Sequence, residues 1–134
     1  MINKSPIKIL AFYYAPLLFW MGLIFYFSSL PGFGRQYSPD IYFYITRKGA
    51  HLIEFFILTI LLIRAVRFYK IKKVYLVSAL FSLAYAFSDE IHQIFVIGRE
   101  GKLSDIGIDL IGIILAVVLY KLFSKKQISN NPPL

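Results

Sequence analysis

The sequence predicts an all-α polytopic membrane protein, a bundle of four transmembrane helices with both termini in the cytoplasm. Three observations predict this fold: an excess of apolar residues, four apolar segments of near-spanning length, and an uneven distribution of lysine and arginine. Of the 134 residues, 58% are hydrophobic, whereas a soluble domain contains about 45–50% apolar residues. A soluble chain of this size would leave much of that apolar surface in water.

Four segments approach the roughly 20 residues that a helix needs to cross a bilayer. They cover residues 9–30, 47–68, 73–96 and 104–123. Pro16 is expected to kink the first segment, and Pro31 with Gly32 to end it. That segment is long for a signal peptide and lacks a small-x-small cleavage site, so a retained helix is favoured over a cleaved one. We therefore expect a four-helix transmembrane domain over residues 1–124 and a polar, disordered tail over residues 125–134.

The basic residues predict the orientation of the bundle. Ten of the fifteen lysines and arginines cluster around the start of the first segment, the turn between the second and third, and the end of the fourth. In a protein with four spans these places share one side, and the positive-inside rule makes that side cytoplasmic. The ten are Lys4, Lys8, Arg64, Arg67, Lys70, Lys72, Lys73, Lys121, Lys125 and Lys126.

Composition also excludes several classes of protein. The net charge is +8, but the cations lie at the ends of apolar runs, so membrane topology explains them better than binding of nucleic acid. With no cysteine in the chain, a disulfide framework, a thiolate nucleophile and a cysteine-based metal site are all excluded.

Polar residues enter the second and fourth segments at the end opposite to the basic clusters. The second segment begins RKGAHLIEF, in which Lys48, His51 and Glu54 recur at three-residue spacing near one stripe of a helix. The fourth begins SDIGID, in which Asp105 and Asp109 are four residues apart and share a side. Both segment ends belong to the non-cytoplasmic face of the predicted bundle.

The third segment ends at the same face with SDEIHQIF. Gln93 follows Asp89 by four residues and Glu90 by three, so its amide can meet either carboxylate. A charge that faces lipid near mid-helix costs about 2.5–3.5 kcal/mol. The buried carboxylates must therefore face one another, their cations or a wet cavity, and we expect one common site beneath the outer headgroups.

We predict two sets of site residues. The groups expected to carry chemistry are His51, Glu54, Asp89, Glu90 and Asp109, and those expected to bind substrate are Lys48, Gln93, Arg99 and Asp105. The alternative is an internal salt-bridge network that only fixes the bundle. Individual residues also have structural alternatives. Asp105 would stabilise a helix amino terminus after the N-cap Ser104, and His92 would be an interface histidine. Arg47 and Lys48 would snorkel to the membrane surface, and Gly107 and Gly112 would allow close packing of helices.

These motifs together resemble the VanZ-like family of small bacterial membrane proteins, over about residues 19–121. The resemblance implies a protein of the bacterial cytoplasmic membrane with a link to resistance against the lipoglycopeptide teicoplanin, and it implies no particular reaction. One departure is Ile97, where a proline is expected before Gly98, which affects only the rigidity of that turn. The matching motifs are K-x-x-H at Lys48 and His51, S-D-E-x-x-Q from Ser88 to Gln93, F-x-x-x-R at Phe95 and Arg99, and S-D-x-x-x-D-x-x-G from Ser104 to Gly112.

Three functions fit the predicted site. The first is a membrane-embedded hydrolase or transferase acting on a lipid or lipid-linked headgroup, with His51 as base or nucleophile and Arg99 with Lys48 as a phosphate clamp. The second is non-catalytic binding of an anionic lipid or lipoglycopeptide. The third, a structural or proton-conducting bundle, is least favoured because the cytoplasmic half offers few polar groups beyond Thr59 and Ser78. For the second function, the expected aromatic walls are Tyr37, Tyr42, Phe43 and Tyr44.

The sequence leaves the cofactor and the oligomeric state open. It contains no G-x-S-x-G, H-E-x-x-H or P-loop pattern. If a divalent metal is used, His51 with Glu54, Asp89, Glu90 and Asp109 suits Mg²⁺, Mn²⁺ or Zn²⁺. The expected partners are the lipid bilayer and a membrane lipid or lipoglycopeptide.

Overall fold

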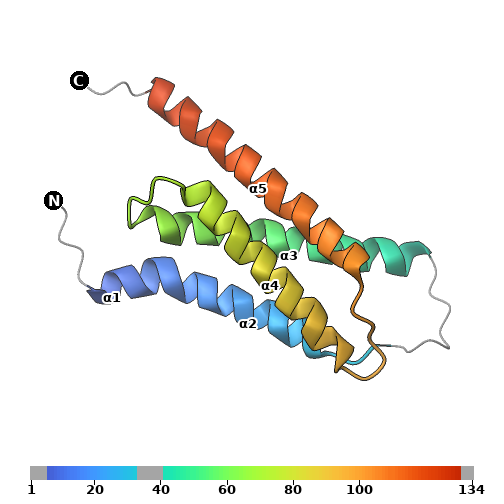
Figure 1. The fold of residues 1–134 in the computed structure, drawn as a ribbon. Helices are drawn as coiled ribbons and strands as arrows, with labels where there is room; N and C mark the ends of the chain where they lie inside the picture. The colour runs from blue at the N-terminus through green and yellow to red at the C-terminus, as the bar shows by residue number, and fades with distance from the viewer. Residues whose placement is uncertain (1–5, 33–40, 131–134) are drawn as a thin grey trace.

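The four predicted spans are helices in the computed structural model, which describes residues 6–32 and 41–130 (Figure 1). The described residues contain no strand. Four stretches are long and apolar enough to cross a membrane: Leu10–Ser29, Tyr44–Arg67, Val74–Ile94 and Leu103–Ser124. The all-α membrane fold is therefore confirmed. In chain order the elements are α1 (Pro6–Ile9), a π-helical turn (Leu10–Tyr14), α2 (Ala15–Ser29), α3 (Ile41–Arg67), α4 (Val74–Ile94) and α5 (Leu103–Asn130).

The first span is irregular where the sequence predicted a kink. The π-helical turn at Leu10–Tyr14 precedes α2, and Pro16 occupies the first turn of the new helix. A proline is tolerated there because its missing N–H would have no intrahelical partner. The change of helix type thus takes the place of a simple bend at Pro16.

Two helix boundaries differ from the prediction. Helix α3 begins at Ile41 rather than at residue 47, because the aromatic segment before Arg47 contains no helix breaker. Helix α5 continues to Asn130, into the polar tail that we expected to be disordered. Lysine and glutamine favour helices, and no glycine or proline interrupts the chain before Pro132. Residues 131–134 of the expected tail lie outside the described residues.

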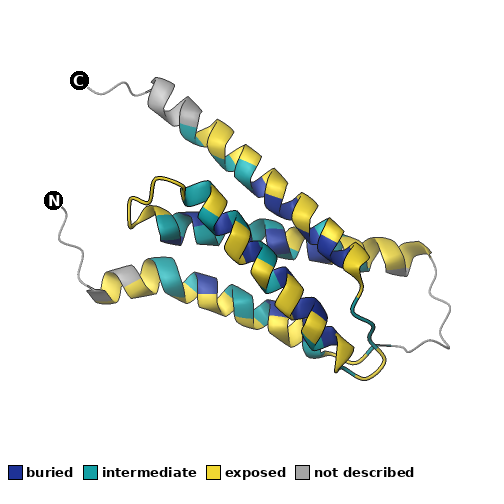
Figure 2. Cartoon of the chain, in the orientation of Figure 1, coloured by how far each residue is buried: buried dark blue, intermediate teal, exposed yellow. Residues whose placement is uncertain are grey.

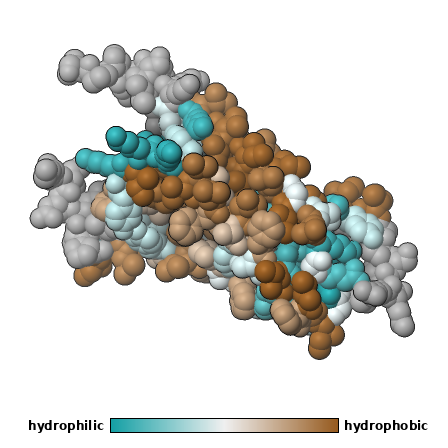
Figure 3. Space-filling view, in the orientation of Figure 1, coloured by the Kyte–Doolittle hydropathy of each residue, from teal (hydrophilic) through white to brown (hydrophobic). Residues whose placement is uncertain are grey.

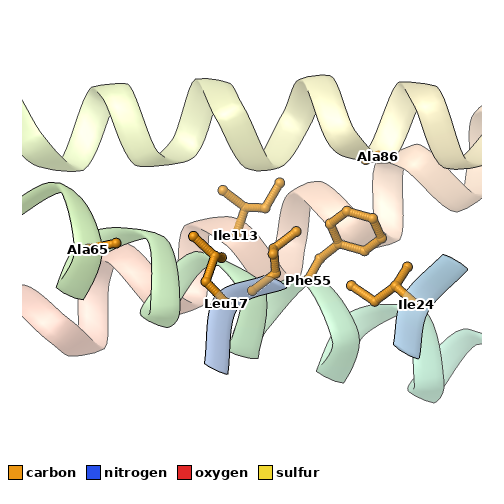
Figure 4. Packing of buried hydrophobic residues seen from close by; sticks show 7 residues of the cluster. Leu17, Ile24, Phe55, Ala65, Ala86 and Ile113 are labelled. Carbon is orange, nitrogen blue, oxygen red and sulfur yellow. The ribbon is translucent and has the colours of Figure 1, made fainter. Parts of the chain in front are cut away.

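Helices α3 and α4 form the centre of the bundle. Each packs against the other and against both α2 and α5, whereas the backbones of α2 and α5 do not come close to each other within the described part of the chain. The core contains Leu17 and Ile24 from α2, Phe55 from α3, Ala86 from α4 and Ile113 from α5 (Figure 4). Every long helix therefore contributes an apolar stripe to one common core.

Gly112 brings the backbones of α3 and α5 together. A Cβ atom at position 112 would overlap the carbonyl oxygen of Leu52 and lie 3.2 Å from the backbone nitrogen of Phe56. Glycine at a helix interface permits this approach. A Cβ at Gly107 would meet nothing within 4 Å, so the packing role expected of both glycines holds only for Gly112.

The outer surface between the two ends of the bundle is apolar. Large hydrophobic side chains such as Phe19, Phe81 and Leu122 are exposed on three different helices. The exposed outer faces are visible in Figure 2, and Figure 3 shows a hydrophobic band between hydrophilic ends. Hydrocarbon is the solvent that suits such a band.

The two ends of the bundle differ in charge. The α3–α4 turn lies at the same end as the start of α1 and the end of α5 (Figure 1), and it carries Arg67, Lys70, Lys72 and Lys73. The opposite end, formed by the end of α2, the start of α3 and the α4–α5 loop, carries most of the carboxylates. We call it the acidic end, after Glu54, Asp89, Glu90, Asp105 and Asp109. Lys4, one of the ten basic residues that predicted the orientation, lies outside the described residues.

Candidate functional site

The acidic end contains a cavity of about 320 Å³ between α2, α3 and α4. The described lining residues come from the end of α2, from α3 and α4, and from the α4–α5 loop, whereas Asp105 and Asp109 of the predicted α5 cluster are not among them. The lining residues are Phe27, Ser28 and Leu30 at the end of α2, Arg47, Ala50, His51 and Glu54 on α3, Asp89 and Gln93 on α4, and Arg99 in the loop.

A buried pair joins the cavity to α5. The Nδ1 atom of His51 lies 3.1 Å from Oδ1 of Asp109, and the Asp109 side chain is 0% exposed. When Nδ1 donates its hydrogen to the carboxylate, the other ring nitrogen of His51 is left as an acceptor. The second oxygen of Asp109, Oδ2, is buried and has no hydrogen-bond partner among the described residues. This pair has the carboxylate–imidazole arrangement that orients a reactive histidine.

Arg47 links three helices at the cavity. Its Nη2 donates to Oε1 of Gln93 at 3.2 Å and lies 3.6 Å from Oδ2 of Asp105. Gln93 in turn donates from Nε2 to Oδ2 of Asp89 at 2.8 Å. Gln93 therefore meets Asp89, one of the two carboxylates within its predicted reach. The result is a continuous polar chain across α3, α4 and α5.

The structure brings Arg47 to the site and leaves Lys48 outside it. Lys48 is exposed and does not line the cavity. At about 100° per residue, Arg47, His51 and Glu54 fall within an arc of about 60°, whereas Lys48 lies about 120° from Glu54. The helical angle was thus a signal that pointed to Arg47.

Glu90 belongs to a second cluster next to the cavity. Its Oε2 accepts a hydrogen bond of 2.6 Å from the backbone N–H of Lys102, and its Oε1 is buried with no hydrogen-bond partner in the part of the chain that the structure describes. One ring nitrogen of His51 and one carboxylate oxygen each of Glu90 and Asp105 lie within 4.8 Å of one another. We call His51, Glu90 and Asp105 the ligand cluster, because these are groups that can hold a metal ion. Glu54 and Asp89, which we included in the predicted metal set, line the cavity instead.

Arg99 closes the carboxyl end of α2. It donates from Nε to the carbonyl of Leu30 at 2.9 Å and from Nη2 to the carbonyl of Phe27 at 2.7 Å. A cation on the last carbonyls of a helix also interacts favourably with the helix dipole. Burial lowers the pKa of the Arg99 side chain, but an arginine still stays protonated at physiological pH. Arg99 therefore combines a structural role with a place in the cavity wall.

His92 packs between helices, outside the cavity. Its Nε2 lies 3.0 Å from the hydroxyl of Ser29, which itself donates to the carbonyl of Phe25 at 2.6 Å. Because that hydroxyl has one hydrogen, His92 is the donor in the first bond. Its ring also stacks on Phe25, with centroids 4.5 Å apart. These contacts match the interface role that was the alternative for His92.

The apolar walls of the cavity come from α2 rather than from the aromatic segment before Arg47. Phe27 and Leu30 line the cavity, whereas Tyr42 and Tyr44 are exposed and do not. Tyr37 lies outside the described residues, as does the side chain of Phe43. Ser28 is a further cavity residue absent from the predicted set, and its buried hydroxyl has no partner among the described residues.

The family of the chain follows from comparison with known proteins. A family model described as VanZ/LLP1 matches residues 12–124. The chain belongs to this family. The match runs through all four spans and the whole acidic end, and it confirms the resemblance found in the motifs. Neither a search of curated proteins nor a search of solved structures found a match for this VanZ/LLP1 protein.

Proposed function

We propose that this VanZ/LLP1 protein is a membrane-embedded enzyme that binds the anionic headgroup of a lipid or lipid-linked molecule in the cavity. It would catalyse hydrolysis or group transfer there. The observation that carries the proposal is the buried His51–Asp109 pair beside a cavity that two arginines also line. Ionisable groups inside membrane spans are costly, and in most membrane proteins they serve a function.

The cavity residues divide into groups that would bind and groups that would react. Arg47 and Arg99 are suited to a phosphate, which a guanidinium binds through paired N–H donors. In hydrolysis of a phosphate ester, the oxygen of water joins the phosphorus and a proton of water reaches the departing alcohol oxygen. His51, oriented by Asp109, is the group that would activate this water, and Glu54 is a second carboxylate on the wall.

The size and rim of the cavity favour a headgroup over a complete lipid. A volume of about 320 Å³ is at the lower end of small-molecule sites, which span roughly 300–1,000 Å³. Phe27 and Leu30 provide apolar contacts for the first part of an acyl or prenyl chain. The remaining chain would then lie along the apolar outer surface of the bundle.

The charge asymmetry supports an outward-facing site. With the basic end and both termini in the cytoplasm, the acidic end would meet the outer leaflet of the bacterial cytoplasmic membrane. Modification of headgroups at this surface would change how a lipoglycopeptide such as teicoplanin reaches its target. This is how the proposed activity would produce the resistance that the family resemblance suggests.

A non-catalytic binding protein is the second candidate. One observation favours it: Arg99 commits two N–H donors to α2, and Arg47 is engaged with Gln93 and Asp105. Such a rigid polar wall suits tight binding of an anionic lipid or a lipoglycopeptide. Sequestration of the ligand would then replace turnover.

Lipid mass spectrometry of overexpressing cells separates the two candidates. Under the proposal, overexpression of the wild type changes the lipid species, and His51→Ala abolishes this change. The control is His92→Ala, which alters the other histidine of the chain and should retain the change in the lipids. Unchanged lipids with a ligand that copurifies would favour binding. If His51→Ala and Glu54→Gln both fold and both behave as the wild type, neither candidate stands.

Trp20 offers a direct binding signal for the same experiment. It is the only tryptophan in the chain, and its Nε1 donates to the backbone carbonyl of Glu54 at 2.9 Å. Anionic and zwitterionic lipids titrated in detergent should therefore differ in their effect on tryptophan fluorescence, with a response to the anionic lipid alone.

A further inference from the structure

We propose that His51, Glu90 and Asp105 bind a divalent transition-metal ion of the Zn²⁺ or Mn²⁺ type. The three side chains come from α3, α4 and α5, and all three are buried. One donor atom from each lies within 4.8 Å of the other two. The ligand cluster therefore places an imidazole nitrogen and two carboxylate oxygens around one point inside the bundle.

The spacing needs only a small adjustment to hold an ion. Nitrogen and oxygen ligands lie at about 2.0–2.2 Å from Zn²⁺, so two ligands of one tetrahedral ion are about 3.3–3.6 Å apart. Closure of the ligand cluster by roughly 1 Å, within reach of side-chain rotation, would complete the geometry. A mixture of imidazole and carboxylate ligands suits Zn²⁺ or Mn²⁺ better than Mg²⁺ or Ca²⁺, which prefer oxygen alone.

Each member of the ligand cluster has a partner that orients it. His51 Nδ1 meets Asp109, Glu90 accepts from the backbone N–H of Lys102, and Asp105 Oδ1 accepts from the hydroxyl of Ser104 at 3.2 Å. Metal-binding histidines almost always give their other ring nitrogen to a carboxylate or carbonyl, and ligating carboxylates are hydrogen-bonded in turn. With Nδ1 directed to Asp109, Nε2 is the ring nitrogen of His51 that remains available to an ion.

Two buried carboxylate oxygens with no partner among the described residues favour a cation at this place. Glu90 is 4% exposed and Asp109 is 0% exposed. Among the described residues, neither Oε1 of Glu90 nor Oδ2 of Asp109 has a hydrogen-bond partner. A buried carboxylate oxygen without a partner is strongly destabilising. A cation between Glu90, Asp105 and His51 would satisfy Glu90 directly and lower the field on Asp109.

The charges of the acidic end agree with this inference. The acidic end is defined by five carboxylates, and the guanidinium groups beside them are those of Arg47 and Arg99. If all are ionised, three negative charges remain, and a divalent cation would reduce them to one. Arg47 lies 3.6 Å from one oxygen of Asp105, but a carboxylate has about four acceptor sites and can bind an ion and a guanidinium together.

The role of the ion rests on the proposed function, whereas its binding does not. Because His51 belongs both to the cavity wall and to the ligand cluster, an ion there would lie next to the headgroup. If bound, the ion would supply Lewis-acid chemistry that lowers the pKa of a water beside the headgroup. His51 would then hold the ion, and Glu54 on the cavity wall would take over as the acceptor of the proton. Binding of the metal alone can be measured with no lipid substrate present.

The test uses the full chain in detergent after treatment with EDTA and removal of the chelator. Titration with ZnCl₂ or MnCl₂, followed by calorimetry, should show one ion per chain. Glu90→Gln and Asp105→Asn should each weaken binding at least 10-fold, and Asp109→Asn should weaken it by about 10-fold to 100-fold. Glu100→Gln is the matched control, because Glu100 is a carboxylate of the α4–α5 loop that pairs with Lys102 outside the ligand cluster, and it should bind the ion as the wild type does.

If the ligand variants fail to fold, a spectroscopic measurement on the wild type still tests the site. Mn²⁺ bound to the wild type should show electron spin-echo modulation from one imidazole nitrogen, and His92→Ala should retain that signal. A folded wild type that binds no stoichiometric ion, or binds one without a nitrogen ligand, would overturn the site. Lipid turnover by a metal-free protein would overturn the role of the ion and leave the proposed function standing. A protein that binds the ion as expected but neither turns over nor binds lipid would overturn the proposed function and leave the metal site standing.

Discussion

His51 on α3 and Asp109 on α5 face each other inside the acidic end, with Nδ1 of the histidine 3.1 Å from Oδ1 of the aspartate. Residues far apart in the sequence thus satisfy each other where neither could be satisfied by lipid. Removal of one partner from a buried pair leaves the other uncompensated, whereas removal of both leaves only a change in packing. The pair should therefore couple the two helices energetically.

A double-mutant cycle measures this coupling. His51→Leu and Asp109→Leu should each lower the free energy of unfolding by about 3 kcal/mol, because each leaves a buried polar group unpaired. The double variant should lose less than the sum by about 1–3 kcal/mol. Denaturant unfolding in detergent gives the three values. Strictly additive losses would mean that the two side chains do not interact.

The glycines of α5 provide a matched pair of substitutions. Gly112→Ala would place a methyl group against the carbonyl oxygen of Leu52, so α3 and α5 must separate. We expect a loss of about 1–3 kcal/mol, in the range of overpacked cores. Gly107→Ala meets nothing within 4 Å and should be neutral or slightly stabilising, since alanine favours a helix over glycine. Thermal unfolding of both variants in one detergent tests the contrast, and equal effects would contradict the packing.

The fold was largely predictable from the sequence because membrane spans are specified by length and apolar content. Helices α2 and α4 end within a few residues of the predicted limits. The extension of α5 past residue 123 was not predicted, because polarity was taken as a sign of disorder. A run without glycine or proline can remain helical whatever its polarity.

The site was predictable where charge marks the inward face of a helix, and not elsewhere. Asp89 and Glu90 are neighbours about 100° apart on α4, so Asp89 lines the cavity while Glu90 meets the α4–α5 loop at Lys102. Phe27, Ser28 and Leu30 could not be assigned, since α2 carries no Asp, Glu, His, Lys or Arg. A helix that is apolar all round gives no sign of which face turns inward.

The contacts of Arg99 predict a local effect on α2. Arg99→Lys keeps the charge but cannot make both hydrogen bonds to Phe27 and Leu30, because lysine lacks the planar fork of N–H groups. We expect faster hydrogen exchange in the last turn of α2 and a loss of about 1 kcal/mol, reduced by the partial exposure of the side chain. Unchanged exchange at residues 27–32 would show that the carbonyls find other partners.

The hydrogen bonds from Arg99 to the end of α2 should be insensitive to pH. Burial lowers the pKa of Arg99, so the folded state holds this proton less tightly than the unfolded state does. The resulting cost is present throughout the range in which arginine is protonated, and it is relieved only at strongly alkaline pH. Exchange rates in the last turn of α2, corrected for the intrinsic pH effect, should therefore stay constant between about pH 6 and pH 9. A change in the exchange rates within that range would mean that a group other than Arg99 protects the last turn of α2.

The orientation of the bundle can be tested with single cysteines, because the chain contains none. Lys102→Cys places an exposed thiol in the α4–α5 loop at the acidic end, and Lys72→Cys places one in the α3–α4 turn at the basic end. If the positive-inside rule applies, a membrane-impermeant maleimide added to intact cells should label position 102 alone, and position 72 should react only after lysis. Neither residue belongs to the cavity or the ligand cluster, so both variants should fold and label with the full stoichiometry once the membrane is dissolved. The opposite pattern would place the cavity at the cytoplasmic leaflet, and the substrate would then have to be a headgroup of that leaflet.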